Sequence, residues 1–277
     1  MIGYYKHAPF SLFLRILVSL AIAITVCTLG FLILYILVKG IPFLKPSLFS
    51  LTYTSENVSF LPSILNTVII VFGSLLVAGP LGICAAIYTV EYARRGNKIV
   101  GLVRITTETL SGIPSIIYGL FGMLFFVTFL HLGYSLVSGI LTISIMILPL
   151  VMRTTEEALR SVPDSYREGS YGLGAGKLRT VLSVILPSAV PGILAGVILA
   201  VGRVVGETAA LVYTAGTVAD FPKGIFSSGR TLSVHMYELS REGFHTGEAY
   251  ATSVILILVI LLINWISNKF AKKIGKT

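Results

Sequence analysis

Two charged residues, Arg203 and Glu207, stand in a stretch of sequence that is otherwise apolar. In a helix, residues four positions apart lie on the same face. An unpaired charge in apolar surroundings is costly, so both side chains should face a bundle interior or a water-filled path. The arginine guanidinium is planar, permanently charged and suited to tetrahedral oxyanions. The pattern predicts an anion path containing Arg203, Glu207 and Thr208, with Glu207 holding Arg203 in orientation; a structural ion pair between helices is the alternative.

The composition indicates that these residues belong to a membrane protein. Hydrophobic residues make up 55% of the 277 residues and charged residues 12%, whereas about a quarter of a typical globular chain is charged. This balance excludes an ordinary soluble domain and intrinsic disorder. The two cysteines, Cys27 and Cys84, are too few for a disulfide framework or a four-cysteine metal site.

Stretches without Asp, Glu, Lys or Arg predict the membrane spans, because a bilayer core of about 30 Å needs about 20 apolar residues in a helix. One stretch, residues 109–152, is long enough for two spans joined by a short turn at residues 131–133. The sequence therefore predicts an all-α integral membrane protein with six transmembrane helices. The uncharged stretches are residues 16–38, 57–90, 109–152, 180–202 and 249–268.

Lysine and arginine are unevenly distributed between the segments that connect these spans. With the N-terminus inside, 15 of the 21 basic residues fall in inside segments and five in outside segments. Positive residues favour the cytoplasmic side of a membrane, so both termini are expected in the cytoplasm. The net charge of +9 then reflects this bias, and we expect no nucleic-acid partner.

The long inside segment, residues 153–187, has the features of a docking element. Pro163 can begin a short amphipathic helix that runs to Tyr171, and glycines follow. Such a helix, lying across the membrane face, can enter a groove on a soluble partner. Residues 174–177 read Gly-Ala-Gly-Lys but lack the other residues of a phosphate-binding loop. We therefore expect no nucleotide, metal or other cofactor on this chain, and no catalytic activity of its own.

The same segment resembles the cytoplasmic EAA signature of ABC importer permeases. That signature is Glu-Ala-Ala, three residues, Gly, nine residues, Ile, one residue and Leu-Pro. Here Gly and Ser replace the two alanines and Val replaces Ile, which keeps small and branched apolar types. The resemblance implies that the segment is the coupling helix, which sits in a cleft of the ATPase subunit. The matching residues are Glu168, Gly169, Ser170, Gly174, Val184, Leu186 and Pro187.

Two further segments resemble the phosphate-importer permeases of the PstA type. Residues 202–211 read Gly-Arg-Val-Val-Gly-Glu-Thr-Ala-Ala-Leu, and residues 111–122 read Ser-Gly-Ile-Pro-Ser-Ile-Ile-Tyr-Gly-Leu-Phe-Gly. The resemblance implies the type I ABC importer permease fold in a prokaryotic cell (inner) membrane. It also implies three parts: an N-terminal helix with its outer connection at 1–60, a permease domain at 61–268 and a basic cytoplasmic tail at 269–277.

The resemblance implies that the chain is a transmembrane subunit of an ATP-driven phosphate importer. Its partners would be a homologous PstC-like permease, two ABC ATPase subunits that use the ATP, an extracytoplasmic phosphate-binding protein, and membrane lipid. The outer segment 218–248, with a short helix at 232–239, would face the binding protein or form a solvated surface. Two alternatives remain: a permease for another oxyanion such as sulfate or molybdate, and a secondary transporter that works without ATP.

Overall fold

The computed structural model describes residues 9–94 and 96–274, and all regular secondary structure in these ranges is helical. Together with the helical turns that continue them, five helices are long and apolar enough to cross a membrane. This confirms the predicted all-α membrane class. The long helices are α1 (Pro9–Gly40), α2 (Leu61–Ile87), α5 (Leu136–Ser161), α8 (Leu186–Val205) and α11 (Thr246–Ile274).

Shorter helical segments continue or connect the long helices. Among them, the π-helical turn η4 (Tyr88–Tyr92) continues α2, and the π-helical turn η6 (Val181–Ile185) leads into α8. The others, in chain order, are η2 (Ile41–Phe43), η3 (Pro46–Phe49), α3 (Lys98–Ser111), α4 (Ser115–Gly122), η5 (Met123–Phe129), α6 (Asp164–Gly172), α7 (Lys177–Thr180), α9 (Ala209–Val212) and α10 (Leu232–Glu242).

The third predicted span, at the beginning of residues 109–152, is present as a bent pair of helices. α3 and the α4–η5 segment are bent by 102° relative to each other, and only as a pair do they make a sixth candidate span. Pro114 explains the break, because its ring removes a backbone donor and disfavours a helical conformation at Ile113. The Tyr118 hydroxyl donates to the carbonyl oxygen of Leu110 at 2.7 Å, which satisfies an acceptor near the end of α3.

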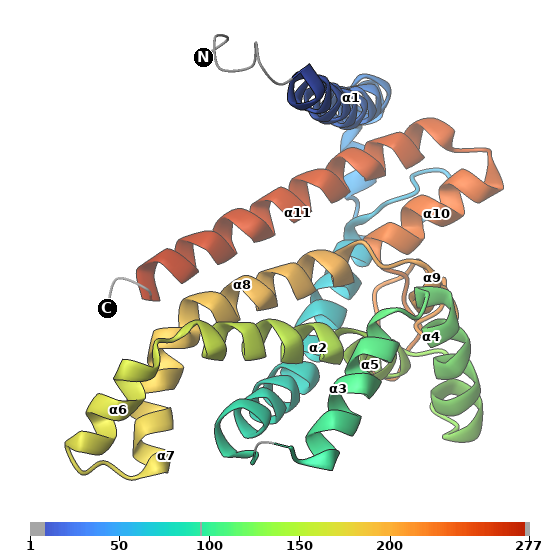
Figure 1. Ribbon diagram of the computed structural model, residues 1–277. Coiled ribbons are helices and arrows are strands. Elements are labelled where there is room, and N and C mark those ends of the chain that lie inside the picture. The colour runs from blue at the N-terminus through green and yellow to red at the C-terminus, as the bar shows by residue number, and fades with distance from the viewer. Residues whose placement is uncertain (1–8, 95, 275–277) are drawn as a thin grey trace.

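Helices α2, α5 and α8 form the centre of the bundle (Figure 1). Their shared core contains fully buried side chains such as Ile70, Ile143 and Val204. Gly196 of α8 lies so close to Thr154 of α5 that a side chain at Gly196 would overlap the threonine side chain. Small residues that allow close helix approach are typical of membrane bundles, where lipid offers no hydrophobic drive to pack.

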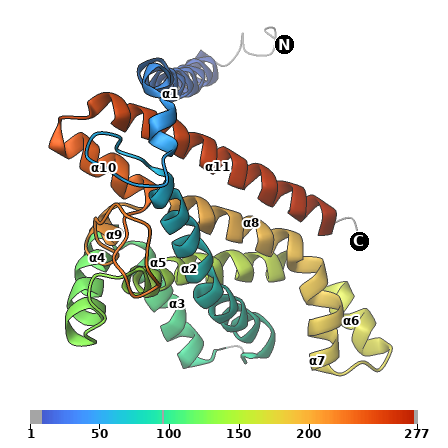
Figure 2. The same ribbon diagram turned by 180° about the vertical axis from the view of Figure 1, so that it is seen from behind.

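The two ends of the bundle carry the two long connecting segments. Helices α6 and α7 project from one end and α10 lies at the other, as both views show (Figures 1 and 2). Helix α1 lies at the edge and packs on α11, where the rings of Tyr35 and Tyr250 meet edge to face at 5.9 Å. None of the most apolar stretch of α1 is buried. The predicted inside and outside segments therefore lie at opposite ends, as the span pattern requires.

Candidate functional site

Arg203 and Glu207 lie near the end of α8 but do not share a helix face. α8 ends at Val205 with Gly206 as its cap, and Glu207 follows in the turn. The Glu207 carboxylate accepts the backbone N–H of Ala210 at 3.1 Å and caps the short helix α9. No ion pair joins Arg203 to Glu207 in residues 9–94 and 96–274. The prediction that Glu207 holds Arg203 in orientation is therefore wrong, because the four-residue spacing applies only within a continuous helix.

The Arg203 guanidinium is available to a ligand. Its side chain is exposed, and none of the described carboxylates lies within 4 Å of it. Thr208 is half-buried, and its hydroxyl lies 3.4 Å from the carbonyl oxygen of Gly206. Arg203 thus presents a permanent positive charge, while Glu207 shapes the backbone that follows it.

The two segments that resemble PstA-type permeases contact each other beside Arg203. Gly119 of α4 lies against α9, where an added Cβ would stand 2.8 Å from the Cα of Ala210. Gly122 is similarly enclosed by the side chains of Thr142 and Thr214. Only a residue without a side chain allows backbones to approach so closely. The glycines of residues 111–122 therefore position α4 against the turn that contains Glu207.

The backbone carbonyl of Glu207 is hydrogen-bonded to the segment 218–248. Ser233, in α10, donates its hydroxyl to the carbonyl oxygen of Glu207 at 2.6 Å. Both residues are buried. The turn after α8 is therefore fixed between α9 and α10, and Arg203 lies at the boundary between the bundle and the outer segment.

The predicted coupling segment folds as the sequence pattern indicates. Pro163 immediately precedes α6, and a turn with Gly174 at a φ of +82° separates α6 from α7. Glu168 and Gly169 lie on exposed positions of α6, and Leu173 is 91% exposed. Tyr166, Tyr171 and Leu178 of the same segment are also exposed, and a group of exposed apolar side chains is typical of a partner surface. The helix is confirmed; its role in coupling remains a prediction.

The remaining signature residues hold this segment to the bundle. The hydroxyls of Ser170 and Thr180 lie 2.9 Å apart and join α6 to α7. Val184 and Leu186 are half-buried against the apolar cluster under α6, and Pro187 occupies the first turn of α8. Because α8 follows η6 without a break, Pro187 lies within a helical run, where its ring removes one backbone N–H donor. A continuous helical path therefore runs from the coupling segment through α8 to Arg203.

Arg167 anchors α6, and the sequence reasoning missed it. Its guanidinium contacts the Glu91 carboxylate at 2.7 Å and donates to the carbonyl oxygens of Leu159 and Val162 at 3.0 and 2.9 Å. The hydrogen bond that Arg167 donates to the Glu91 carboxylate is the main cause that raises the pKa of Arg167 above its ordinary value. Asp164, three residues before Arg167 and 3.1 Å from it, was a local sequence signal. Glu91 is 76 residues away, and no spacing rule connects it to Arg167.

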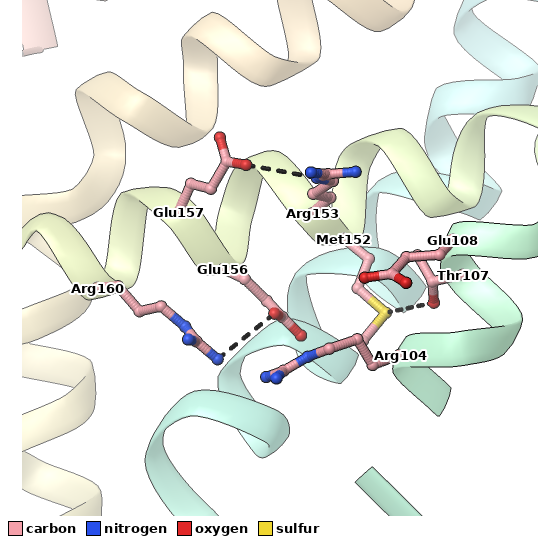
Figure 3. A pocket seen from close by; sticks show the side chains of 8 residues that line it. All are labelled: Arg104, Thr107, Glu108, Met152, Arg153, Glu156, Glu157 and Arg160. Atoms are coloured by element: carbon pink, nitrogen blue, oxygen red, sulfur yellow. Dashed lines mark hydrogen bonds and ion pairs between the residues drawn. The ribbon is translucent and has the colours of Figure 1, made fainter. Parts of the chain in front are cut away.

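A charged cleft of about 190 Å³ lies between α3 and α5, beside the coupling segment (Figure 3). Arg153 contacts Glu157 at 3.4 Å, and Arg160 contacts Glu156 at 3.8 Å. Arg104 and Glu108 of α3 face these pairs across the cleft. The basic and acidic side chains are equal in number here, so the cleft offers no preference for an anion.

A buried polar cluster lies at the other end of the bundle, around α10. Arg230 is 4% exposed, its guanidinium carbon lies 4.7 Å from the Tyr53 ring centroid, and its Nε and Nη2 atoms donate to no described group. His235 is fully buried, with Nε2 3.2 Å from the Val58 carbonyl oxygen. Burial, and then the charge of Arg230, lower the pKa of His235 from 6.5 to about 3. The outer segment is therefore partly a packed structure and not only a solvated surface.

The fold and these features define a permease of the type I ABC importer class. The chain belongs to the family of binding-protein-dependent transport system inner membrane components, whose family model matches residues 78–276. An alginate ABC transporter, solved in complex with its alginate-bound periplasmic protein, contains a chain with the same fold at a TM-score of 0.72. That likeness covers 99% of this chain and 98% of the other at 16% identity.

Two relatives place the chain more closely. It is 37% identical over 229 residues to the probable ABC transporter permease protein YqgI of Bacillus subtilis. The matched region covers 76% of this chain and 78% of that protein. It is 34% identical over 218 residues to the phosphate transport system permease protein PstA 2 of Mycobacterium tuberculosis, covering 75% and 72%. The resemblance to PstA-type permeases is thus confirmed at the level of relatedness.

Proposed function

We propose that this chain is the transmembrane permease subunit of an ATP-driven importer of inorganic phosphate. The observation that carries the proposal is the exposed guanidinium of Arg203, without a carboxylate partner among the described residues, in a chain related to phosphate transport permeases. An arginine cannot lose its charge, so a site within a membrane bundle must supply water or an anion to solvate it. Phosphate oxygens match the two parallel N–H groups of a guanidinium edge.

Among the described residues, Arg203 and Glu207 form no ion pair, which supports the anion path over the structural ion pair. A carboxylate bound to Arg203 would compete with an incoming oxyanion for the same N–H groups. Glu207 is instead engaged by the backbone of Ala210. The hydroxyl of Thr208 lies in the same turn and can donate to the anion, as Ser and Thr hydroxyls do.

The helical path through the coupling segment gives this proposal a mechanical link. Arg167 and Glu91 tie α6 to the helical turn η4 at the end of α2. The Gly174 turn joins α6 to α7, and α7 continues through η6 into α8, which carries Arg203. Movement of an ATPase subunit against the exposed face of α6 would therefore move α8. A ligand or nucleotide can shift the equilibrium between two conformations of the transporter only if its contacts differ between them. The docked helix α6 is the element that would make those contacts.

The assembly that follows has the composition of a binding-protein-dependent importer. In this proposal a homologous PstC-like permease completes the path, two ABC ATPase subunits bind the coupling helices, and an extracytoplasmic phosphate-binding protein delivers the anion at the α10 end. The ATP is bound and hydrolysed by the ATPase subunits. Relatives that carry the name of a phosphate transport permease support the substrate, while the shared fold with an alginate transporter does not select it.

Uptake by the reconstituted complex tests the proposal. Labelled phosphate is expected to enter proteoliposomes that contain both permeases and the ATPase, with binding protein outside and ATP inside. Unlabelled sulfate or molybdate should compete poorly. Efficient competition by sulfate or molybdate would identify another oxyanion as the substrate, and uptake without ATP would identify a secondary transporter.

A further inference from the structure

A second pocket at the α6 end of the bundle is strongly basic. It has a volume of about 470 Å³ and lies between the α2–α3 turn and the end of α5. Arg94, Arg104 and Arg160 line it from three different elements, together with Asn97 and Thr89. No Asp or Glu is among the described residues that line it. Arg104 and Arg160 also line the neighbouring cleft, where acidic and basic side chains balance, whereas Arg94 lines only this pocket.

Two carboxylates close to this pocket, Glu156 and Glu91, already have partners. Glu156 accepts a hydrogen bond from Thr89 at 2.6 Å and contacts Arg160 at 3.8 Å. Glu91 is held by Arg167 at 2.7 Å. Among the described residues, Arg94 and Arg104 form no ion pair. Two guanidinium groups and part of a third therefore remain available to an external anion.

The location of the pocket indicates which anion it receives. The candidate span that contains α2 ends at Tyr92, and the next candidate pair begins at Lys98, so the turn between them lies at a membrane boundary. On α3, beside the pocket, three apolar side chains face outward: Ile99, Leu102 and Ile105 are 64%, 65% and 64% exposed. A basic pocket next to an exposed apolar helix face matches a molecule with an anionic head and a hydrocarbon tail.

The N-terminus of α3 lies beside the pocket and adds to its positive potential. Asn97 caps the N-terminus of α3 by accepting the N–H of Ile99 at 2.9 Å. A helix N-terminus carries a partial positive charge and favours a bound phosphate group. Gly96, at a φ of +83°, has no other atoms within 4 Å of where a side chain would start.

We propose that Arg94, Arg104 and Arg160 form a binding site for the phosphodiester headgroup of an anionic phospholipid, with its acyl chains along the outward face of α3. The site is independent of the transported substrate. Arg160 lies on the last turn of α5, which leads directly into α6. A bound lipid thus braces the end of α5 from which the coupling helix projects.

The test uses the assembled transporter in nanodiscs of phosphatidylcholine, with and without a minor fraction of phosphatidylglycerol. Native mass spectrometry and hydrogen exchange over residues 96–104 measure bound lipid. Wild-type protein should retain phosphatidylglycerol, and the variant Arg94→Gln/Arg104→Gln/Arg160→Gln should lose about 100-fold in affinity for it, from the contribution of three charges near a membrane surface. The matched control, Lys269→Gln/Lys272→Gln/Lys273→Gln, removes three charges from the end of α11 and should retain the lipid.

Further arms distinguish the sources of phosphate. Inorganic phosphate added to phosphatidylcholine nanodiscs should give no protection of residues 96–104; protection there would identify a free-anion site and overturn the lipid assignment. Equal lipid loss in the triple variant and the control would also overturn it, because binding would then follow overall charge. If the triple variant fails to assemble, the single variant Arg94→Gln replaces it, with an expected loss of about fivefold, and unchanged lipid affinity would refute the proposal.

Discussion

Replacing Arg167 by alanine should release the coupling helix from the bundle. The substitution removes the contact to Glu91 at 2.7 Å and the bonds to two carbonyl oxygens. The side chains of Arg167 and Glu91 are only 16% and 5% exposed, so the carboxylate would be left buried without its partner. Breaking a buried pair in this way costs about 3–5 kcal/mol, and we expect about 3 kcal/mol because some solvent reaches Arg167.

A loss of about 3 kcal/mol changes the equilibrium between docked and released α6 by about 100-fold. Hydrogen exchange of the amides in residues 164–172, measured on the assembled transporter, reports this change directly. ATPase activity should also become less dependent on the binding protein. The control is Arg153→Ala, which breaks a pair with Glu157 whose side chains are 62% and 68% exposed. Such pairs contribute about 0.2–1 kcal/mol at most.

A double-mutant cycle with Glu91→Gln separates the ion pair from general destabilisation. The two substitutions remove one interaction, so their combined effect on α6 exchange should be smaller than the sum of the single effects. If α6 in Arg167→Ala exchanges as slowly as in the wild type, the anchor described here is refuted. Strictly additive effects in the cycle would show that the two side chains do not interact energetically.

Three other substitutions and one control probe separate features. Gly119→Val should force α4 away from Ala210 and abolish uptake, whereas Gly30→Val, where no atoms lie within 4 Å, should leave uptake unchanged. Gly174→Asp should weaken ATPase co-purification, since its φ of +82° disfavours side chains. Folding lowers the pKa of His235 from 6.5 to about 3. As the pH falls, His235 therefore binds a proton in the unfolded protein before it does so in the folded protein. Acidification from about pH 7 to 5 should therefore lower the free energy of unfolding by about 2 kcal/mol. Thermal melts should show a fall in melting temperature over this range, and the fall should be smaller in His235→Gln.

The spans and the coupling helix could be predicted because their causes are local. A bilayer requires long uncharged helices, and the stretches around α1, α2, α5, α8 and α11 satisfy that requirement in the sequence itself. The helix after Pro163 and the turn at Gly174 likewise follow from single residues with restricted or permissive backbones.

The errors arose where a helix ends inside an apolar stretch. Pro114 bends the third span and Gly206 closes α8, yet continuous hydrophobicity concealed both breaks. Both residues are recognised helix breakers, so a reading of the sequence that weighed them could have found these ends. The contact of Arg167 with Glu91 and the burial of Arg230 depend on distant segments meeting in the fold. No spacing in the sequence contains that information.

The central claim, that an oxyanion passes the guanidinium of Arg203, is tested most directly by phosphate uptake into proteoliposomes with the variant Arg203→Gln. The complex should assemble with its partners and retain basal ATP hydrolysis, while uptake of labelled phosphate falls by about 100-fold or more, the loss expected for one charged hydrogen-bonded contact of 3 kcal/mol. Arg203→Lys, which keeps the charge but not the two parallel donors, should recover only part of that loss. Wild-type rates of phosphate uptake in a fully assembled Arg203→Gln complex would contradict the account.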